Sequence, residues 1–435
     1  MSGQSRLRWW APSRWMGRGV WARIAVVAVV WGSLFAGSRS GAADWPRFRG
    51  PNGTGISAEK NIPLECTAEN TVWKVDLKGT GNASPIVADG KVYLQSATPT
   101  ERVFHCLDLA TGAEQWAFRL PGAVGHTHKK NSLASCTAAA DGGRVFVPLW
   151  DGDKLHLFAF DSSGMKLWSH NLGSFASQHG PGHAPICVDD KVILFDETDE
   201  RSRLVAFEMA TGKLVWEAKR PITRTCYSTP VLHERPNGEW EVVVTSTASI
   251  SAYDLKTGAT NWNWEWTGNK LRTVASPVLA EGMVFISSGD GGGNRRIAAV
   301  RTDGRGDLPG SYLAWGRDKG FPYVPSMLAL GTHLYYISDK GIAGCVVAKS
   351  GEEVWSERIG GNFSASPLII DGKIYLFSED GELTVISATP AFEKLASSNL
   401  GESITATPAV ADGKLLVRGS THLFAFSATR KVAAK

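Results

Sequence analysis

Short runs of alternating apolar and polar residues recur along this chain, and most of them follow a small residue, a Ser or Thr, a Pro and an apolar residue. Clear copies are ASPIVADGKVYL from Ala83, ASPVLAEGMVFI from Ala275 and ATPAVADGKLLV from Ala406. Period-two alternation bounded by Gly, Asp and Pro predicts β-strands, and no segment sustains the 3.6-residue period of a helix. The pattern therefore predicts an all-β protein.

The strand pattern occurs in eight copies, so one repeat architecture accounts for the 435 residues better than a series of unrelated domains. Aligning the copies on their Pro gives units of about 40 to 50 residues, the length of one supersecondary repeat. The anchor positions are Pro85, Cys136, Pro185, Pro230, Pro277, Pro325, Pro367 and Pro408, with Cys136 in a degenerate copy.

Five units also carry a Gly four residues before a Trp, as in Gly112 and Trp116. An Asp-Gly pair predicts a tight hairpin between the first two strands of a unit, and Thr-Gly predicts a turn between the last two. Each unit is therefore predicted to form four antiparallel strands. We expect the Trp side chains to pack between units.

A four-stranded unit of this size cannot cover both of its apolar faces, so the units must stack on one another, and a closed ring removes the exposed ends. This predicts an eight-bladed β-propeller over residues 44–435. The last unit ends after three strands, and residues 71–77, which include Trp73, are expected to supply its fourth strand. An insertion between Gly304 and Trp315 and a seventh unit without a Trp are expected to be tolerated as loops.

Residues 1–43 have the composition of a secretory signal peptide: six Arg, an apolar core over residues 24–36 and a small-residue tract that ends at Ala43. The apolar core is shorter than the roughly 20 residues that span a membrane. We therefore expect cleavage near Ala43, with an uncleaved anchor as the alternative, and export to the periplasm or outside the cell. No transmembrane span is expected in the mature chain.

The net charge of +4 comes from that leader. Without its six Arg the balance is 40 basic to 42 acidic side chains, which gives no reason to expect nucleic acid as a partner. No serine-hydrolase, zinc-protease or phosphate-loop motif is present, so no catalytic residue is assigned. The cysteines are predicted to be small buried thiols, and the sequence leaves open any pairing among Cys66, Cys106, Cys136, Cys187, Cys226 and Cys345.

Polar side chains precede the first strand of several units, and in a propeller these segments converge on one face beside the central channel. The candidate ligand-binding residues at this rim are His126, His128, Lys129, Asn131, His179, His183, Arg224, Tyr227, Arg272, Tyr323 and Asn362, with Asn82 and Lys130 in the same segments.

Three interpretations of this rim stay open: a cationic pocket for an anionic or polyhydroxyl ligand, a metal site, and solvated loop residues without a ligand. Metal ligation would use His126, His128, His179 and His183, because neutral imidazoles bind transition metals. For an anionic ligand we expect imidazole pKa values near about 6.5 and binding that weakens as the pH rises from about 6 to 8.

The repeat unit resembles the PQQ-type repeat of quinoprotein alcohol dehydrogenases and of the lipoprotein subunit of the outer-membrane barrel assembly machinery. The segments DWPRFRGPNGTGIS, HTHKKNSLASCT, HGPGHAP, DGRGDL, GGNFSASP and FSEDGELTVIS resemble, in this order, exported PQQ-binding-like propeller proteins of Planctomycetes. The resemblance implies PQQ with calcium as the candidate cofactor. The adjacent Cys pair of many such dehydrogenases and a C-x-x-C-H haem motif are absent, and no calcium ligand can be placed by motif.

Two functions follow as expectations. The first is an exported, non-catalytic binding or scaffold module of the cell envelope, a monomer with a protein or polymer as its partner. The alternative is a PQQ-dependent dehydrogenase of alcohols or sugars. The sequence leaves the identity of the ligand or substrate open.

Overall fold

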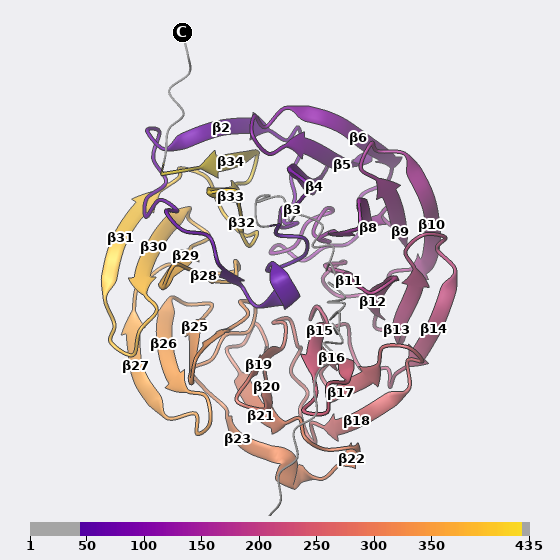
Figure 1. Ribbon diagram of the computed structural model, residues 1–435, viewed down its shortest axis with the longest axis vertical. Coiled ribbons are helices and arrows are strands. Elements are labelled where there is room, and N and C mark those ends of the chain that lie inside the picture. The colour runs from indigo at the N-terminus through magenta and orange to yellow at the C-terminus, as the bar shows by residue number, and fades with distance from the viewer. Residues whose placement is uncertain (1–43, 429–435) are drawn as a thin grey trace, which may run out of the picture. The chain divides into compact units, whose positions relative to one another are not determined.

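The computed structural model describes residues 44–428, whose strands form eight sheets around a common axis (Figure 1). Each sheet contains four antiparallel strands, the first nearest the axis, and two sheets gain a fifth strand at an edge. The predicted all-β, eight-bladed propeller is confirmed. The signal peptide predicted for residues 1–43 lies outside the described residues.

Blades 1 to 4 follow the order of the sequence. Blade 1 contains β3 (Ile86–Ala88), β4 (Lys91–Ala97), β5 (Glu101–Asp108) and β6 (Glu114–Pro121). Blade 2 contains β7 (Ala139–Asp141), β8 (Arg144–Trp150), β9 (Lys154–Asp161) and β10 (Lys166–Ser174). Blade 3 contains β11 (Ile186–Val188), β12 (Lys191–Glu197), β13 (Ser202–Glu208) and β14 (Leu214–Lys219). Blade 4 contains β15 (Val231–Glu234), β16 (Trp240–Thr245), β17 (Ser249–Asp254) and β18 (Thr260–Glu265).

Blades 5 to 8 complete the ring. Blade 5 contains β19 (Val278–Ala280), β20 (Met283–Gly289), β21 (Arg295–Arg301) and β23 (Leu313–Arg317). Blade 6 contains β24 (Leu328–Leu330), β25 (His333–Ile337), β26 (Ile342–Val347) and β27 (Glu353–Arg358). Blade 7 contains β28 (Leu368–Ile370), β29 (Lys373–Phe377), β30 (Glu382–Ser387) and β31 (Lys394–Asn399). Blade 8 contains β32 (Ala409–Ala411), β33 (Lys414–Arg418), β34 (His422–Phe426) and β2 (Thr71–Asp76).

The insertion in the fifth unit is ordered against its neighbour. It contains β22 (Gly306–Leu308) and the short helix η2 (Gly310–Tyr312). Strand β22 pairs in parallel with β18, so the insertion covers the outer edge of blade 4. The insertion therefore leaves the ring intact while it protects one strand edge.

Two of the sequence anchors are displaced from their true positions. The first strand of a blade begins one residue after its anchor, as β3 begins after Pro85, but β7 begins at Ala139 and β24 at Leu328. The anchors of blades 2 and 6 are therefore residues 138 and 327, each two positions after the one expected. The alignment failed there because neither position carries a Pro.

The Trp side chains pack between blades, as predicted. The indole of Trp116 in blade 1 lies against Gly164 of blade 2, where an added Cβ would come within 2.7 Å of the ring. Its Nε1–H donates to the carbonyl of Ser162 at 3.2 Å. Trp73 repeats the arrangement from blade 8 to blade 1, against Gly112. Gly is needed at both positions because φ is positive there and a Cβ would collide with the indole ring.

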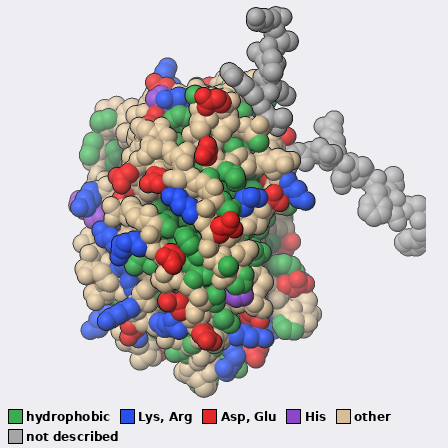
Figure 2. All heavy atoms as spheres, turned by 90° about the vertical axis from the view of Figure 1, so that its left-hand side faces the viewer, with side chains coloured by type: hydrophobic (Ala, Val, Ile, Leu, Met, Phe, Trp, Pro, Cys, Tyr) green, Lys and Arg blue, Asp and Glu red, His purple; other side chains and the backbone are tan. Residues whose placement is uncertain are grey.

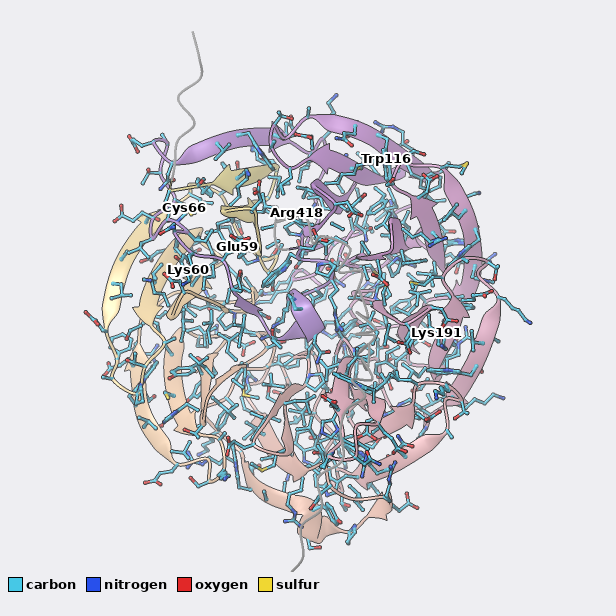
Figure 3. The ribbon with its side chains drawn as sticks, in the orientation of Figure 1. Glu59, Lys60, Cys66, Trp116, Lys191 and Arg418 are labelled. Atoms are coloured by element: carbon cyan, nitrogen blue, oxygen red, sulfur yellow. The ribbon has the colours of Figure 1, made fainter. Side chains whose placement is uncertain are left out.

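The ring closes through strands from both ends of the propeller. Strand β2 pairs antiparallel with β34, so residues near the N-terminus complete blade 8. Arg418 of blade 8 reaches into blade 1, where its Nη1 donates to the carbonyls of Ala83 at 3.0 Å and Gln95 at 2.6 Å. Figure 3 shows Arg418 nearer the axis than Trp116. Burial lowers the pKa of this guanidinium to about 9.

The segment from Trp45 to β1 (Ile56–Ser57) crosses the axis and closes one end of the channel. Trp45 bridges to β3, and β1 pairs in parallel with β28 on another blade. Between them, Arg47 Nη2 donates to the carbonyl of Pro230 at 2.5 Å, and Arg49 Nη2 to that of Met327 at 2.6 Å. The short helix η1 (Pro51–Gly53) lies at the centre of the ring in Figure 1.

The hydrophobic core is divided among clusters between adjacent blades. The side of the ring that Figure 2 presents carries Lys, Arg, Asp and Glu side chains interspersed over its surface. Across residues 44–428, no helix has the length and apolar character needed to span a membrane.

Candidate ligand-binding cavity

A cavity of about 210 Å³ lies on the axis, lined by the segments that precede the first strand of the blades. Phe48, from the segment that crosses the axis, contributes one aromatic side chain to its wall. The rest of the lining combines apolar side chains, such as Val274 and Val324, with amide, imidazole and hydroxyl groups, and no Asp or Glu belongs to it. Among the described residues, Lys130 is therefore the one permanently charged side chain of the lining.

The structure brings only some of the predicted rim residues into this cavity. The predicted residues in the lining are His128, Asn131, His179, Tyr227 and Tyr323. The predicted residues outside it are His126, Lys129, His183, Arg224, Arg272 and Asn362. Of these, Lys129 and His126 are exposed, whereas His183 and Arg272 are 3% and 2% exposed and belong to the interior.

A ring of Ser and Thr hydroxyls was not anticipated from the sequence. Each accepts a hydrogen bond from the backbone N–H of the equivalent residue in the preceding blade, for example Ser326 N–H to Ser366 Oγ at 3.0 Å. The lining members that accept in this way are Thr137, Ser326, Ser366 and Thr407. A Ser or Thr precedes the anchor in every blade except blade 3, which has Ala184, so the signal was present in the sequence.

These hydroxyls are left as donors toward the cavity. A hydroxyl has one O–H proton and two lone pairs, and one lone pair already serves the backbone. Within residues 44–428, none of the four O–H groups donates to another protein atom. The cavity therefore offers several O–H donors to a ligand or to water.

The two histidines of the lining are also donors. His179 Nδ1 is in contact with Arg272 Nη1, and His128 Nδ1 accepts from the backbone N–H of Lys130 at 3.3 Å. Guanidinium and amide groups only donate, so both Nδ1 atoms accept and both protons lie on Nε2. The centroids of the two imidazole rings are 4.7 Å apart. Each ring therefore offers an Nε2–H donor.

The expectation of imidazole pKa values near 6.5 is wrong for three of the histidines. Burial, aided by the positive charge of Arg272, lowers the pKa of His179 to about 4. Burial and the neighbouring lysines lower the pKa of His128. Burial lowers the pKa of His183 to about 4, although the Asp196 carboxylate acts in the opposite direction. These rings are therefore neutral at pH 7.

Arg272 supports the cavity wall from behind. Its Nη2 donates to Gln178 Oε1 at 3.5 Å, and its guanidinium lies over the Tyr227 ring at 6.0 Å. Arg224 and Arg272, both candidates for the rim, differ in exposure. Arg272 is enclosed, while Arg224 is partly exposed and donates to the carbonyl of Lys270 at 3.1 Å. The wall is positioned by Arg272 but lined by His179.

Lys130, a partly exposed residue of the lining, forms an ion pair with a residue of a distant blade. Its Nζ lies 2.7 Å from Glu379 Oε1, although Lys130 precedes blade 2 and Glu379 belongs to blade 7. Lys130 lines the cavity and Glu379 does not.

The described residues contain no group of three or more His, Cys, Asp or Glu arranged to hold a metal ion. The four candidate histidines are not gathered: His126 Nε2 meets the carbonyl of Gln178 at 3.1 Å, and His183 is buried with neither ring nitrogen bonded. All six cysteines are unpaired, and all but Cys187 are buried, in agreement with the predicted thiols.

A family model described as "Outer membrane protein assembly factor BamB" matches residues 64–305 and 326–430. The chain belongs to this family. BamB from Yersinia pestis is 23% identical over 251 residues, covering 52% of this chain and 58% of the relative. The crystal structure of BamB from Moraxella catarrhalis is similar, with a TM-score of 0.58 and 14% identity over 82% of this chain and 99% of that one.

Quinoprotein dehydrogenases share the same fold. The dehydrogenase subunit of the quinone alcohol dehydrogenase of Gluconobacter oxydans is 25% identical over 300 residues, covering 64% of this chain and 36% of the relative. The quinohemoprotein alcohol dehydrogenase structure from Comamonas testosteroni has a TM-score of 0.66 and 15% identity, over 90% of this chain and 82% of that one. The chain thus spans little more than a third of the Gluconobacter relative and just over half of the Yersinia one.

The residues of this cavity do not fit calcium beside a quinone. Calcium takes six to eight oxygen ligands, usually with several carboxylates among them. The cavity lining supplies hydroxyls, the amides of Asn82 and Asn131, two neutral imidazoles and Lys130, and no carboxylate. The donor set of the cavity is therefore wrong for a divalent cation.

Proposed function

We propose that the chain is an exported, non-catalytic binding module of the cell envelope that holds part of a protein or polymer ligand in the mouth of its axial cavity. The observation that carries this proposal is the lining: hydroxyl and Nε2–H donors and one lysine, with no carboxylate. Such a lining presents donors that recognise hydrogen-bond acceptor groups. Membership of the BamB family supports a binding role.

The alternative is a PQQ-dependent dehydrogenase, which the similarity to quinoprotein alcohol dehydrogenases favours. Reconstitution separates the two functions. Purified protein is incubated with PQQ and calcium and assayed for dye-linked oxidation of alcohols and sugars. We expect no turnover above the protein-free control, and robust turnover would reverse the order of the two functions.

A cavity-filling substitution tests the binding role directly. Val324 lines the cavity, so Val324→Trp would occupy part of it. The matched control is Val124→Trp, because Val124 is 69% exposed and outside the lining. In capture from envelope extract, a ligand retained by the wild type and by Val124→Trp should be lost by Val324→Trp. Equal retention by all three proteins would place binding elsewhere.

A further inference from the structure

The ion pair between Lys130 and Glu379 lies at the border of the cavity lining and joins segments that are far apart in sequence. The Lys130 side chain is 39% exposed and the Glu379 side chain 20% exposed, so solvent reaches both. An ion pair in this setting is weak, because water screens it. Lys130 can therefore exchange this partner for another anion at small cost.

Both residues are held in place by contacts that do not depend on their pairing. The carbonyl of Lys130 accepts from Asn82 Nδ2 at 3.0 Å. On the other side, Ser364 Oγ–H donates to Glu379 Oε1 at 2.5 Å, and the Glu379 N–H donates to the carbonyl of Asn362 at 2.7 Å. If the ion pair opened, the two backbones would keep their anchors, so only the lysine side chain needs to move.

The loop that carries Lys130 is tied to blade 3 as well. Asn131 Nδ2 donates to the carbonyls of His179 at 2.8 Å and Pro181 at 3.0 Å, and the His128 N–H donates to the His179 carbonyl at 3.1 Å. These bonds tie the backbones of His128 and His179 together, and both residues line the same cavity as Lys130. Their Nε2–H groups and the hydroxyl ring supply neutral donors in a lining that contains one cation, Lys130.

Neutral donors around a single cation match one kind of ligand group. Each donor needs an acceptor, and an oxyanion offers several acceptor oxygens together with a charge for the lysine. A neutral polyol has no charge with which to separate Lys130 from Glu379. Its hydroxyls would also have to act only as acceptors, which leaves their own protons without partners. The lining thus favours a phosphate, sulfate or carboxylate group.

We propose that an oxyanion of the ligand enters the cavity by taking Lys130 from Glu379, which acts as a built-in competitor that sets the affinity of the site. This inference rests on the proposed function and names the ligand chemistry and the residue that tunes it. It follows that removing the competitor strengthens binding, whereas removing the lysine weakens it.

Isothermal titration calorimetry at constant ionic strength tests this exchange with two probes, inorganic phosphate and acetate. Glu379→Gln is compared with Asp380→Asn, which removes the same charge from the same loop at an exposed position. Lys130→Gln is compared with its exposed neighbour, Lys129→Gln. Relative to these controls, Glu379→Gln should raise the association constant about threefold, and Lys130→Gln should lower it about tenfold. The probe that responds identifies a phosphate-like or a carboxylate ligand.

Two results would overturn the exchange. If Lys130→Gln weakens binding while Glu379→Gln equals Asp380→Asn, the cavity binds oxyanions but Glu379 is not a competitor. If no protein binds either probe, the oxyanion inference fails, and the capture experiment with Val324→Trp still decides the proposed binding role on its own.

Discussion

His183 offers a direct test of how this fold treats a buried titratable group. Its side chain is 3% exposed, and neither ring nitrogen has a hydrogen-bond partner among residues 44–428. The ring packs edge-on against Phe175 with centroids 5.2 Å apart. Burial lowers its pKa to about 4, so the folded protein holds the ring neutral where the unfolded chain, with a pKa of about 6.5, would protonate it.

The sign and size of the effect follow from linkage. Below a pH of about 6.5 the unfolded state binds a proton that the folded state does not, so stability falls with the pH until about pH 4 and then levels. The full shift corresponds to about 3 kcal/mol, of which roughly 2.5 kcal/mol is lost between pH 7.5 and pH 4.5. His183→Leu removes this term while it keeps an apolar side chain of similar size.

Urea unfolding followed by tryptophan fluorescence at pH 7.5 and pH 4.5 measures the difference. The loss of stability between the two pH values should be about 2.5 kcal/mol smaller for His183→Leu than for the wild type. Phe175→Leu is the control, because it disturbs the same ring contact but keeps His183. It should lower the free energy of unfolding by the same amount at both pH values. If His183→Leu and the wild type lose the same stability, His183 is protonated in the folded protein and the burial argument is refuted.

Three further predictions follow from the same geometry. Gly164→Ala should lower the free energy of unfolding by about 1 to 3 kcal/mol, because the added Cβ meets the Trp116 ring and the position has a φ of +91°; Gly268→Ala, where the Cβ meets nothing within 4 Å, is the control in thermal melts. Arg272→Ala should lower the free energy of unfolding by about 2 to 4 kcal/mol because it empties a buried position. Arg224→Ala should change it by no more than about 0.5 kcal/mol. Equal thermal midpoints for the two variants would contradict the enclosure of Arg272. Sulfate affinity, measured by calorimetry, should be constant from about pH 7 to pH 8, since burial lowers the pKa of both cavity histidines and leaves them neutral there. Weaker binding at pH 8 than at pH 7 would show that these histidines titrate in that range.

The repeat of local signals along the sequence was sufficient to predict the propeller. Strand alternation, hairpin turns and the Gly four residues before a Trp each act within one unit, so their eightfold recurrence predicted the blades and the packing of Trp116 between them. Where a unit lacked the local signal, the predicted anchor position was wrong. The anchors of blades 2 and 6 were placed at Cys136 and Pro325 because the true anchor positions, Ala138 and Met327, carry no Pro.

The chemistry of the cavity depended on contacts between distant segments. The sequence predicted that polar segments converge beside the axis, and His128 and His179 do line one cavity. Whether a side chain there is exposed, charged or paired is decided by what packs against it: Arg272 is enclosed behind His179, and Lys130 meets Glu379 from a blade 249 residues away. Burial and electrostatic pairing depend on distances in space, and the alternation of residues along a strand does not contain those distances.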